Sequence, residues 1–117
     1  MTWQLSTGQS DYQWLMNVIT KYKQGKLTEF KYAKGSANMR YEPKEGDEVY
    51  VTCRAKLLLK GKIQYTFTWE YNPNVKVYEK YATIKITEVI DDKRYMKGQR
   101  RNWTKIKENE CVLNDEI

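Results

Sequence analysis

The amino-acid sequence predicts a small α+β domain, with five or six short, mostly antiparallel strands in a barrel or strongly bent sheet and one N-terminal helix packed on it. Three observations lead to this prediction. The chain has 117 residues, enough for one domain but not for two cores. One early stretch has apolar residues at helical spacing. Several later stretches alternate apolar and polar residues, as half-buried strands do.

The first elements are a strand, a polar elbow and a helix. Residues 2–6 (TWQLS) have the pattern of a strand. The polar elbow follows, and Ser10 or Asp11 is a suitable N-cap for the helix. Apolar side chains recur at helical spacing over residues 10–24. Gly25 is expected to end this helix.

The next part of the chain is read as a short extended segment at 27–32, followed by a long turn-rich loop at 33–47. Long structured loops in small domains often carry function. Alternation then predicts strands in EVYVTCRA, KIQYTFTW, YATIKITEVI and RNWTKI. We expect Lys60-Gly61 at the start of the second of these strands, and a turn at 70–74 (EYNPN) after it.

The strand KIQYTFTW shows the clearest alternation. Its pattern places four large side chains on one face: Ile63, Tyr65, Phe67 and Trp69. Tyr65 and Phe67 are expected to pack in the core, together with Trp3. In the strand that follows, Ala82, Ile84 and Ile86 are expected to share one buried face.

Composition narrows the classes of function. The chain has no His and only two cysteines, Cys53 and Cys111, which is too few for a disulfide scaffold and makes a zinc site a poor expectation. We expect no metal and no cofactor. The lack of His also removes the commonest general base, although catalysis by Lys, Tyr, Glu or Arg stays open. No apolar run approaches membrane-spanning length and no signal peptide is evident, so we expect an intracellular protein, cytoplasmic or nuclear, without a membrane partner.

Charge is distributed unevenly along the chain. The formal net charge is +6, but residues 108–117 hold four acids and no base. Residues 1–107 therefore carry 21 bases against 11 acids, a net charge of +10. We read 1–107 as a single domain and 108–117 as an acidic tail. A basic domain of this size attracts polyanions, although a soluble basic surface without a specific partner has the same composition.

Three stretches have residues suited to binding nucleic acid. The elbow between the first strand and the helix offers backbone amides and small hydroxyls, or is an ordinary capping turn. Residues 44–63 place Arg54, Lys56, Lys60 and Lys62 around one hairpin end, which could also be simply solvated. Residues 91–107 interleave Lys and Arg with Tyr95 and Trp103, a combination suited to phosphate contacts and stacking but also to a flexible basic loop.

Aromatic residues are biased toward rings with a polar edge. The chain has four Trp and ten Tyr but only two Phe. Such rings suit interfaces and base stacking. Those in or beside predicted loops are Tyr12, Trp14, Phe30, Tyr32, Tyr41, Trp69 and Trp103. Each of them is equally compatible with packing in the core, and Trp14 also has the spacing of a buried helix face.

The order of these pieces resembles the EVE domains of the PUA-like superfamily, whose relatives include the YTH and ASCH domains. The resemblance rests on Trp3 and Ser6 in the opening strand and turn, the Gly46-Asp47 turn before a strand, and the Lys60-Gly61 step. It covers roughly residues 1–107, with 70–100 matched less closely and no counterpart for the acidic tail. It implies a pseudobarrel whose pocket takes in a nucleobase, often a modified one, between aromatic side chains.

The resemblance also indicates which residues would form such a site here. The base pocket would be lined by Ser6, Tyr12, Trp14, Tyr32, Asn38, Met39 and Tyr41. Phosphates would be held by Arg54, Lys56, Lys97, Arg100 and Arg101, with Trp69 and Trp103 as further stacking candidates. The loop FKYAKGSANMRY lacks the Trp that family cages often carry. The predicted function is a non-enzymatic module that binds RNA or DNA.

Two other functions stay open. The first is a protein-binding accessory factor of the viral or phage type, which would use the aromatic surface and the acidic tail. The second is a small ASCH-like enzyme that cleaves RNA or hydrolyses amides. Its candidate residues are Arg54, Lys56, Tyr41 and Glu70.

Overall fold

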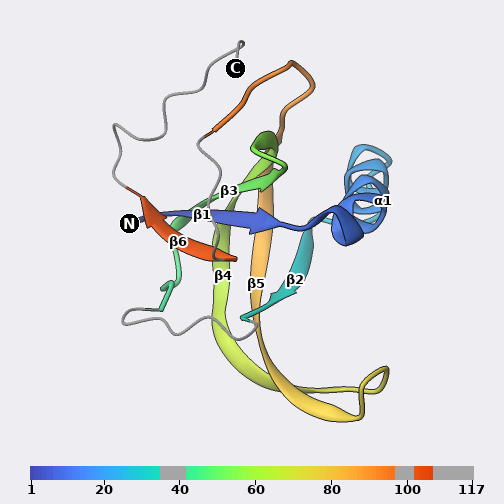
Figure 1. The fold of residues 1–117 in the computed structure, drawn as a ribbon, viewed down its shortest axis with the longest axis vertical. Helices are drawn as coiled ribbons and strands as arrows, with labels where there is room; N and C mark the ends of the chain where they lie inside the picture. The colour runs from blue at the N-terminus through green and yellow to red at the C-terminus, as the bar shows by residue number, and fades with distance from the viewer. Residues whose placement is uncertain (35–41, 97–101, 107–117) are drawn as a thin grey trace.

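The computed structural model describes residues 1–34, 42–96 and 102–106, and Figure 1 shows their arrangement. The elements in chain order are β1 (Thr2–Thr7), a short 3₁₀ helix η1 (Gln9–Asp11), α1 (Tyr12–Lys23), β2 (Glu29–Ala33), β3 (Glu48–Cys53), β4 (Lys56–Asn72), β5 (Val77–Val89) and β6 (Trp103–Ile106). One α-helix and six strands among the described residues agree with the predicted α+β class.

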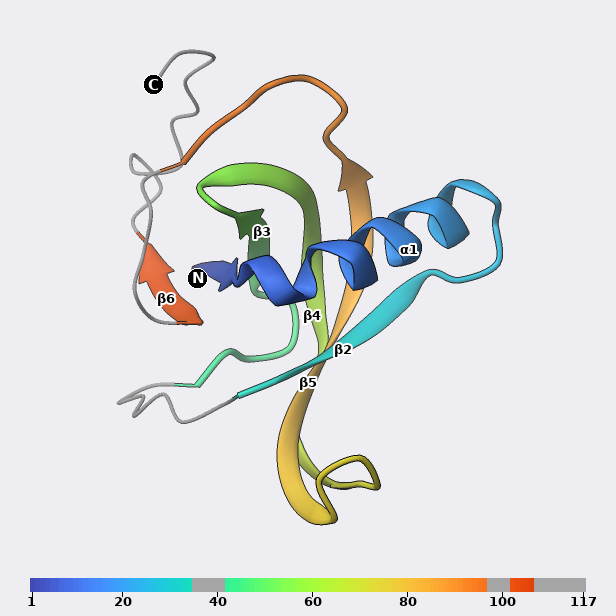
Figure 2. The ribbon, with the colours of Figure 1, turned by 45° about the vertical axis from the view of Figure 1, so that its right-hand side comes forward.

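The six strands form one mixed sheet in the order β2-β5-β4-β3-β1-β6. Four of the five neighbouring pairs are antiparallel, and only β1 and β3 run parallel. The sheet bends strongly but does not close, so of the two predicted forms, a barrel or a strongly bent sheet, it is the bent sheet. The edge strands β6 and β2 nevertheless approach each other, because the Trp103 indole Nε1 donates a hydrogen bond of 3.1 Å to the Ala33 carbonyl (Figures 1 and 2).

The core fills the inside of this curl. The apolar positions of β1 and β3 face it, including Leu5, Val49 and Val51, which are completely buried. The helix α1 adds Leu15, Val18 and Ile19 to the same cluster, as its helical spacing predicts. Gly25 follows the helix with φ at +72°, which is the backbone conformation expected of a glycine at a helix end.

The longest strand, β4, is bent by irregularities in its pairing with β5. The register shifts at Lys60/Gly61, at Ile63/Tyr65 and at Tyr65/Thr68. Lys60-Gly61 therefore lies inside the strand and not at its start, contrary to expectation. A Cβ atom on Gly61 would come within 2.6 Å of both the Ile84 side chain and the Lys85 carbonyl. Glycine is therefore required where β5 approaches β4 this closely.

The same shifts correct the predicted face of KIQYTFTW. Ile63 pairs with Ile84 and is buried, but the extra residue before Tyr65 turns that side chain to the opposite face, beside Thr83. The second shift returns Phe67 to the core face. Tyr65 is consequently exposed and not a core residue, because a bulge reverses the alternation from which its position was predicted.

The outer half of the β4–β5 hairpin projects from the domain as a two-stranded arm, which we define as residues 68–81. The ladder between β3 and β4 ends at the Glu48–Lys62 pair, and the ladder between β2 and β5 ends at Ala33–Tyr81. Figures 1 and 2 show the arm extending away from the other strands. The predicted turn at 70–74 is wrong, since β4 continues to Asn72 and the turn begins after it.

The Asp47 carboxylate links β1 to the turn that precedes β3 through hydrogen bonds. Its carboxylate accepts hydrogen bonds from the Trp3 indole at 3.0 Å and from the Lys44 backbone N–H at 2.9 Å, and it contacts the Met1 amine at 3.3 Å. The preceding Gly46 has φ at +89°, which confirms the expected tight turn. Burial acts to raise the pKa of Asp47, but the hydrogen bonds from Lys44 and Trp3 and the nearby amine outweigh it and hold the pKa below its ordinary value.

We expect Asp47→Asn to lower the free energy of unfolding by about 2 kcal/mol, because donors to a buried carboxylate would face an amide instead. The folded-state pKa is lowered, so this stabilisation is complete above the unfolded pKa of about 3.9 and is lost as the pH falls through the folded value. Urea unfolding of both proteins between pH 7 and pH 2 measures it. Glu48→Gln, at an exposed neighbour, is the control. A constant difference between Asp47→Asn and the unaltered chain down to pH 2 would contradict this account.

Candidate functional site

The arm carries a row of exposed rings on one of its faces. Trp69 and Tyr71 are two residues apart on β4 and so point to the same side. Their partners across the ladder are Lys80 and Tyr78. We call these four residues the ring face. The exposed fractions of the three rings are 65% for Trp69, 51% for Tyr71 and 67% for Tyr78.

The ring face is an outward continuation of the core face. Phe67 shares its side of β4 with Trp69, and Ala82 shares its side of β5 with Lys80, yet both inner residues are buried. Trp103 closes the core at this point by packing its ring against Phe67, with centroids 5.4 Å apart. Beyond that contact no described element covers the sheet. The rings of the arm are therefore exposed where the rings of the body are packed.

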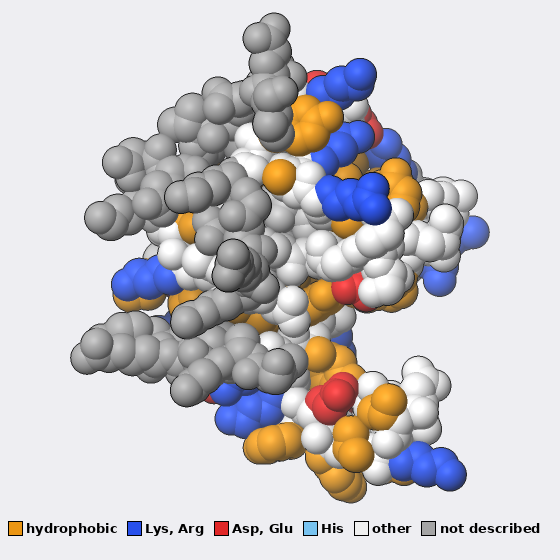
Figure 3. Space-filling model, viewed as in Figure 1, with side chains coloured by type: hydrophobic (Ala, Val, Ile, Leu, Met, Phe, Trp, Pro, Cys, Tyr) orange, Lys and Arg blue, Asp and Glu red, His pale blue; other side chains and the backbone are white. Residues whose placement is uncertain are grey.

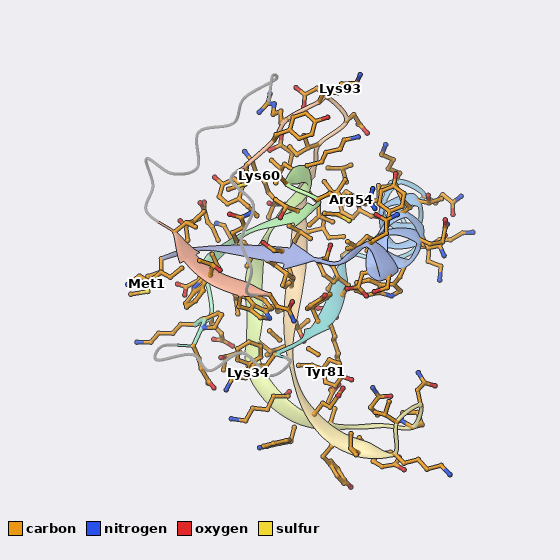
Figure 4. The ribbon with its side chains drawn as sticks, in the orientation of Figure 1. Met1, Lys34, Arg54, Lys60, Tyr81 and Lys93 are labelled. Carbon is orange, nitrogen blue, oxygen red and sulfur yellow. The ribbon has the colours of Figure 1, made fainter. Side chains whose placement is uncertain are left out.

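The rings and cations of this face contact one another. The Tyr71 and Tyr78 rings lie 5.3 Å apart, and the Lys80 ammonium lies 5.4 Å from the centre of the Trp69 ring. Lys34 and Lys80 both approach the Glu42 carboxylate at 3.7 Å. A depression of about 410 Å³ is lined by Lys34, Trp69, Tyr78, Glu79 and Lys80. Figure 4 shows Lys34 where the arm leaves the body.

The opposite face of the arm is polar and internally bonded. The Asn72 side-chain amide donates to Glu79 and to the Tyr81 hydroxyl, each at 3.1 Å, and Tyr81 donates to Glu79 at 2.7 Å. These bonds hold the pKa of Glu79 below its ordinary value, and the bond to Glu79 raises the pKa of Tyr81. Lys31 adds an ion pair with Glu70. The arm thus has one satisfied polar face and one exposed aromatic face.

The residues predicted for a base pocket are brought partly together. Trp14 packs against Tyr32 with ring centroids 6.0 Å apart and against Phe30 at 5.7 Å, and it keeps 39% of its surface exposed. Tyr12 is exposed to the same extent. The Ser6 hydroxyl is buried and has no hydrogen-bond partner among the described residues, and its backbone N–H donates to the Asn102 carbonyl.

The Tyr32 hydroxyl is engaged by the helix start. It donates a hydrogen bond of 2.6 Å to Asp11, which occupies the N-cap position of α1 without capping it through its side chain. Burial, followed by this hydrogen bond and the negative charge of Asp11, raises the pKa of Tyr32. Trp14, Tyr32 and Asp11 therefore form a bonded junction between α1 and β2.

The two described residues among the predicted phosphate contacts, Arg54 and Lys56, lie at the far end of β4 from the arm. Arg54 lies in the tight β3–β4 turn and Lys56 follows it at the start of β4, and Cys53 pairs with Thr7, so Arg54 sits beside the elbow. Figure 4 shows Arg54 near the start of α1, and Figure 3 shows Lys and Arg side chains gathered in that upper region. Lys60 is partly occupied, because it approaches Glu88 at 3.7 Å and lies 5.2 Å from the Tyr50 ring centre.

The two predicted stacking residues have different outcomes. Trp69 is exposed, as stacking requires, but Trp103 is 1% exposed and belongs to the core. The expectation for Trp103 is therefore wrong: its ring packs on Phe67, and its indole N–H is bonded to Ala33. Six predicted site residues lie outside the described residues: Asn38, Met39, Tyr41, Lys97, Arg100 and Arg101.

The residues suggested for an enzyme do not converge where they are described. Arg54 and Lys56 lie at the first end of β4, whereas Glu70 lies on the arm and pairs with Lys31. Tyr41 lies outside the described residues. Among residues 1–34, 42–96 and 102–106, no cluster of three or more His, Cys, Asp or Glu side chains is arranged to hold a metal ion. In the same ranges, no helix has the length and apolar character to cross a membrane.

Comparison of the chain with protein-family models, with curated proteins and with solved structures found no match. The resemblance to EVE domains therefore stays a prediction.

Sequence reasoning missed Tyr71 and Tyr78. The signal was present, because Phe67, Trp69 and Tyr71 alternate without interruption. Reading EYNPN as a turn removed Tyr71 from the strand. Tyr78 was missed because residues 75–79 were assigned to no strand, although β5 begins at Val77.

We expect Tyr32→Phe to lower the free energy of unfolding by about 1 kcal/mol at neutral pH, because it removes the hydrogen bond to Asp11. The folded-state pKa of Tyr32 is raised, so this stabilisation is complete below the unfolded pKa of about 10 and is lost as the pH rises through the folded value. Denaturant unfolding of both proteins at pH 7 to 11 measures the difference. Equal stability at pH 7 would show that the junction contributes nothing.

Proposed function

We propose that the protein is a non-enzymatic nucleic-acid-binding module that holds unpaired bases on the ring face. The observation that carries this proposal is the row of three exposed rings, Trp69, Tyr71 and Tyr78, on one side of a projecting ribbon beside Lys80. Exposed apolar surface gathered in one place is typical of an interaction site. Figure 3 shows the hydrophobic side chains gathered on the arm.

Stacking gives the ring face its selectivity for single strands. A base must be unpaired to lie flat on an aromatic side chain, and each stacked base contributes about 1–3 kcal/mol. Trp69 has one ring side near the Lys80 ammonium, at 5.4 Å from the ring centre. A base would stack on the other side. Two ring positions on one strand, at residues 69 and 71, would engage successive bases of an extended strand.

The lysines around the rings supply phosphate contacts. Lys34 and Lys80 each form a partly exposed ion pair with Glu42 at 3.7 Å, and such pairs contribute little to stability. An incoming phosphate can therefore replace the carboxylate at small cost. The net charge of +10 on residues 1–107 would draw a polyanion to the domain from a distance.

The elbow is a second candidate location for a base, possessing the partly exposed Trp14 and the nearby Arg54. A pocket that reads a modified base there, as the EVE resemblance implies, would also need Asn38, Met39 and Tyr41. The ring face is favoured because its rings are more exposed and are not engaged by a bonded junction.

We expect Trp69→Ala to weaken binding of a short single-stranded oligonucleotide about 5- to 150-fold, because it removes one stacking platform. Trp14→Ala is the matched variant at the elbow and should leave this affinity nearly unchanged. Fluorescence anisotropy titrations with single-stranded and duplex oligomers of RNA and DNA measure both. A loss with Trp14→Ala but not with Trp69→Ala would move the site to the elbow, and no binding by the unaltered chain would end the proposal.

We expect Glu42→Gln to raise the affinity for the same oligonucleotide by up to about fivefold, since it frees Lys34 and Lys80 from a competing carboxylate. Lys80→Gln should lower the affinity and reduce the slope of log K against log salt by about 1. Asp92→Asn is the control, because it removes one acid that pairs with Arg94 outside the arm. If Glu42→Gln and Asp92→Asn raise the affinity equally, the effect reflects net charge and not this site.

A further inference from the structure

The register of the arm fixes the direction of its backbone groups. The Lys34 N–H donates to the Lys80 carbonyl at 2.8 Å, so the backbone of Lys80 faces β2 and not β4. In an antiparallel ladder, opposite residues either exchange both hydrogen bonds or exchange none, in alternation. The Trp69–Lys80 pair therefore exchanges none, and the Tyr71–Tyr78 pair, two residues further, also exchanges none. The N–H and C=O groups of Trp69 and Tyr71 thus point away from β5.

These groups form an open strand edge. Among the described residues, β4 pairs with β3 only as far as Lys62, and the segment before β3 covers it only as far as Thr66, whose hydroxyl donates to the Pro43 carbonyl. No described residue pairs with the outer edge from Phe67 to Asn72. Natural proteins usually protect such an edge with Lys or Pro. The sequence of this edge, FTWEYN, has neither, and its residues favour β structure.

We propose that this edge of β4 pairs with the same edge of a second copy of the chain, in antiparallel orientation. The partner is a second copy because the edge is complementary to itself. Residues 64–72 contain no Lys or Arg, although the chain carries a net charge of +6, and their single acid, Glu70, is paired with Lys31. Two such strands can approach without the repulsion that opposes contact elsewhere, and aromatic and Thr side chains pair favourably across strands.

The arm carries much of the exposed apolar surface of the described residues. Its exposed large apolar side chains are Trp69, Tyr71, Val75, Val77 and Tyr78, which account for five of the nine such side chains among the described residues. With roughly 200 Å² for each aromatic side chain, half to two-thirds exposed, the three rings of the arm present roughly 350 Å² of apolar surface. Edge pairing would cover the outward backbone groups of β4 and bring side chains of the two copies together across the new strand pair, while the ring faces stay exposed.

A two-fold axis perpendicular to the plane of the ribbon would relate the two copies. Two-fold symmetry is the commonest symmetry of dimers. Such an axis keeps the two ring faces on the same side. The dimer would therefore be a four-stranded ribbon with one continuous aromatic surface. The pairing itself does not depend on nucleic acid and is tested without it.

Amide hydrogen exchange of the full chain tests the proposal without any substitution. The Trp69 and Tyr71 amides should become protected as the protein concentration rises, in step with a monomer–dimer shift seen by sedimentation velocity. The Glu70 and Asn72 amides, which face β5, should be protected at every concentration. A chain that sediments as a monomer from micromolar to millimolar concentration, with Trp69 and Tyr71 amides unprotected throughout, would overturn the proposal.

Two variants at one position separate the edge from the ring. Tyr71→Pro removes an outward N–H while leaving every bond to β5, so it should be monomeric at concentrations where the unaltered chain is mostly dimer. Tyr71→Thr removes the ring but keeps the N–H, and should still dimerise, within about tenfold of the original affinity. Far-ultraviolet circular dichroism checks that both variants fold. Dimerisation of a folded Tyr71→Pro protein at the original affinity would show that this edge is not the interface.

Discussion

The whole structure depends on the close antiparallel pairing of β4 and β5. These two strands pair inside the sheet and continue outward as the arm, and every other strand joins them directly or through β3. The two strands approach closely at Gly61, because the Ile84 side chain and the Lys85 carbonyl occupy the space that a Cβ atom would take. The bulges that follow bend β4 sharply, since extra residues on one strand increase its local twist. Any residue other than glycine at position 61 would push the ladder apart at the point from which both halves are organised.

The bend explains why aromatic side chains of one strand have opposite environments. Phe67 and Trp69 lie on the same side of β4, two residues apart, but one is 8% exposed and the other 65%. The exposures differ because the Trp103 ring packs against Phe67 and covers it. The Trp103 indole N–H also donates a hydrogen bond to Ala33 and so links β6 to β2. The core ends at this residue because no described element extends further along the ribbon. The ring face is thus a core surface continued beyond the elements that would cover it.

Local pattern was enough to predict the helix, the first and last strands and the buried face of β5. Leu15, Val18 and Ile19 are buried at the helical spacing that the sequence shows, and Ala82, Ile84 and Ile86 are buried on alternate residues. The position of Tyr65 could not be predicted, because a bulge depends on how two distant strands fit and has no local pattern. The burial of Trp103 likewise depends on β6 meeting the opposite edge of the sheet. For the site, the sequence left Trp69 open between core and surface, and the structure has it exposed. Tyr71 was missed because the turn was assigned three residues too early, and Tyr78 because its segment was assigned to no strand.

One feature of the register produces both the ring face and the open edge. Pairs that exchange no hydrogen bonds bring their side chains closest, with Cα atoms about 4.5 Å apart, which is why Tyr71 meets Tyr78 and Lys80 meets Trp69. The same pairs necessarily direct their backbone groups outward. A ribbon that assembles aromatic side chains in this way therefore leaves donors and acceptors unpaired along both of its sides. On the β5 side, Lys34 satisfies the Lys80 carbonyl. On the β4 side, the N–H and C=O groups of Trp69 and Tyr71 have no partner among the described residues, so water or another strand must supply one.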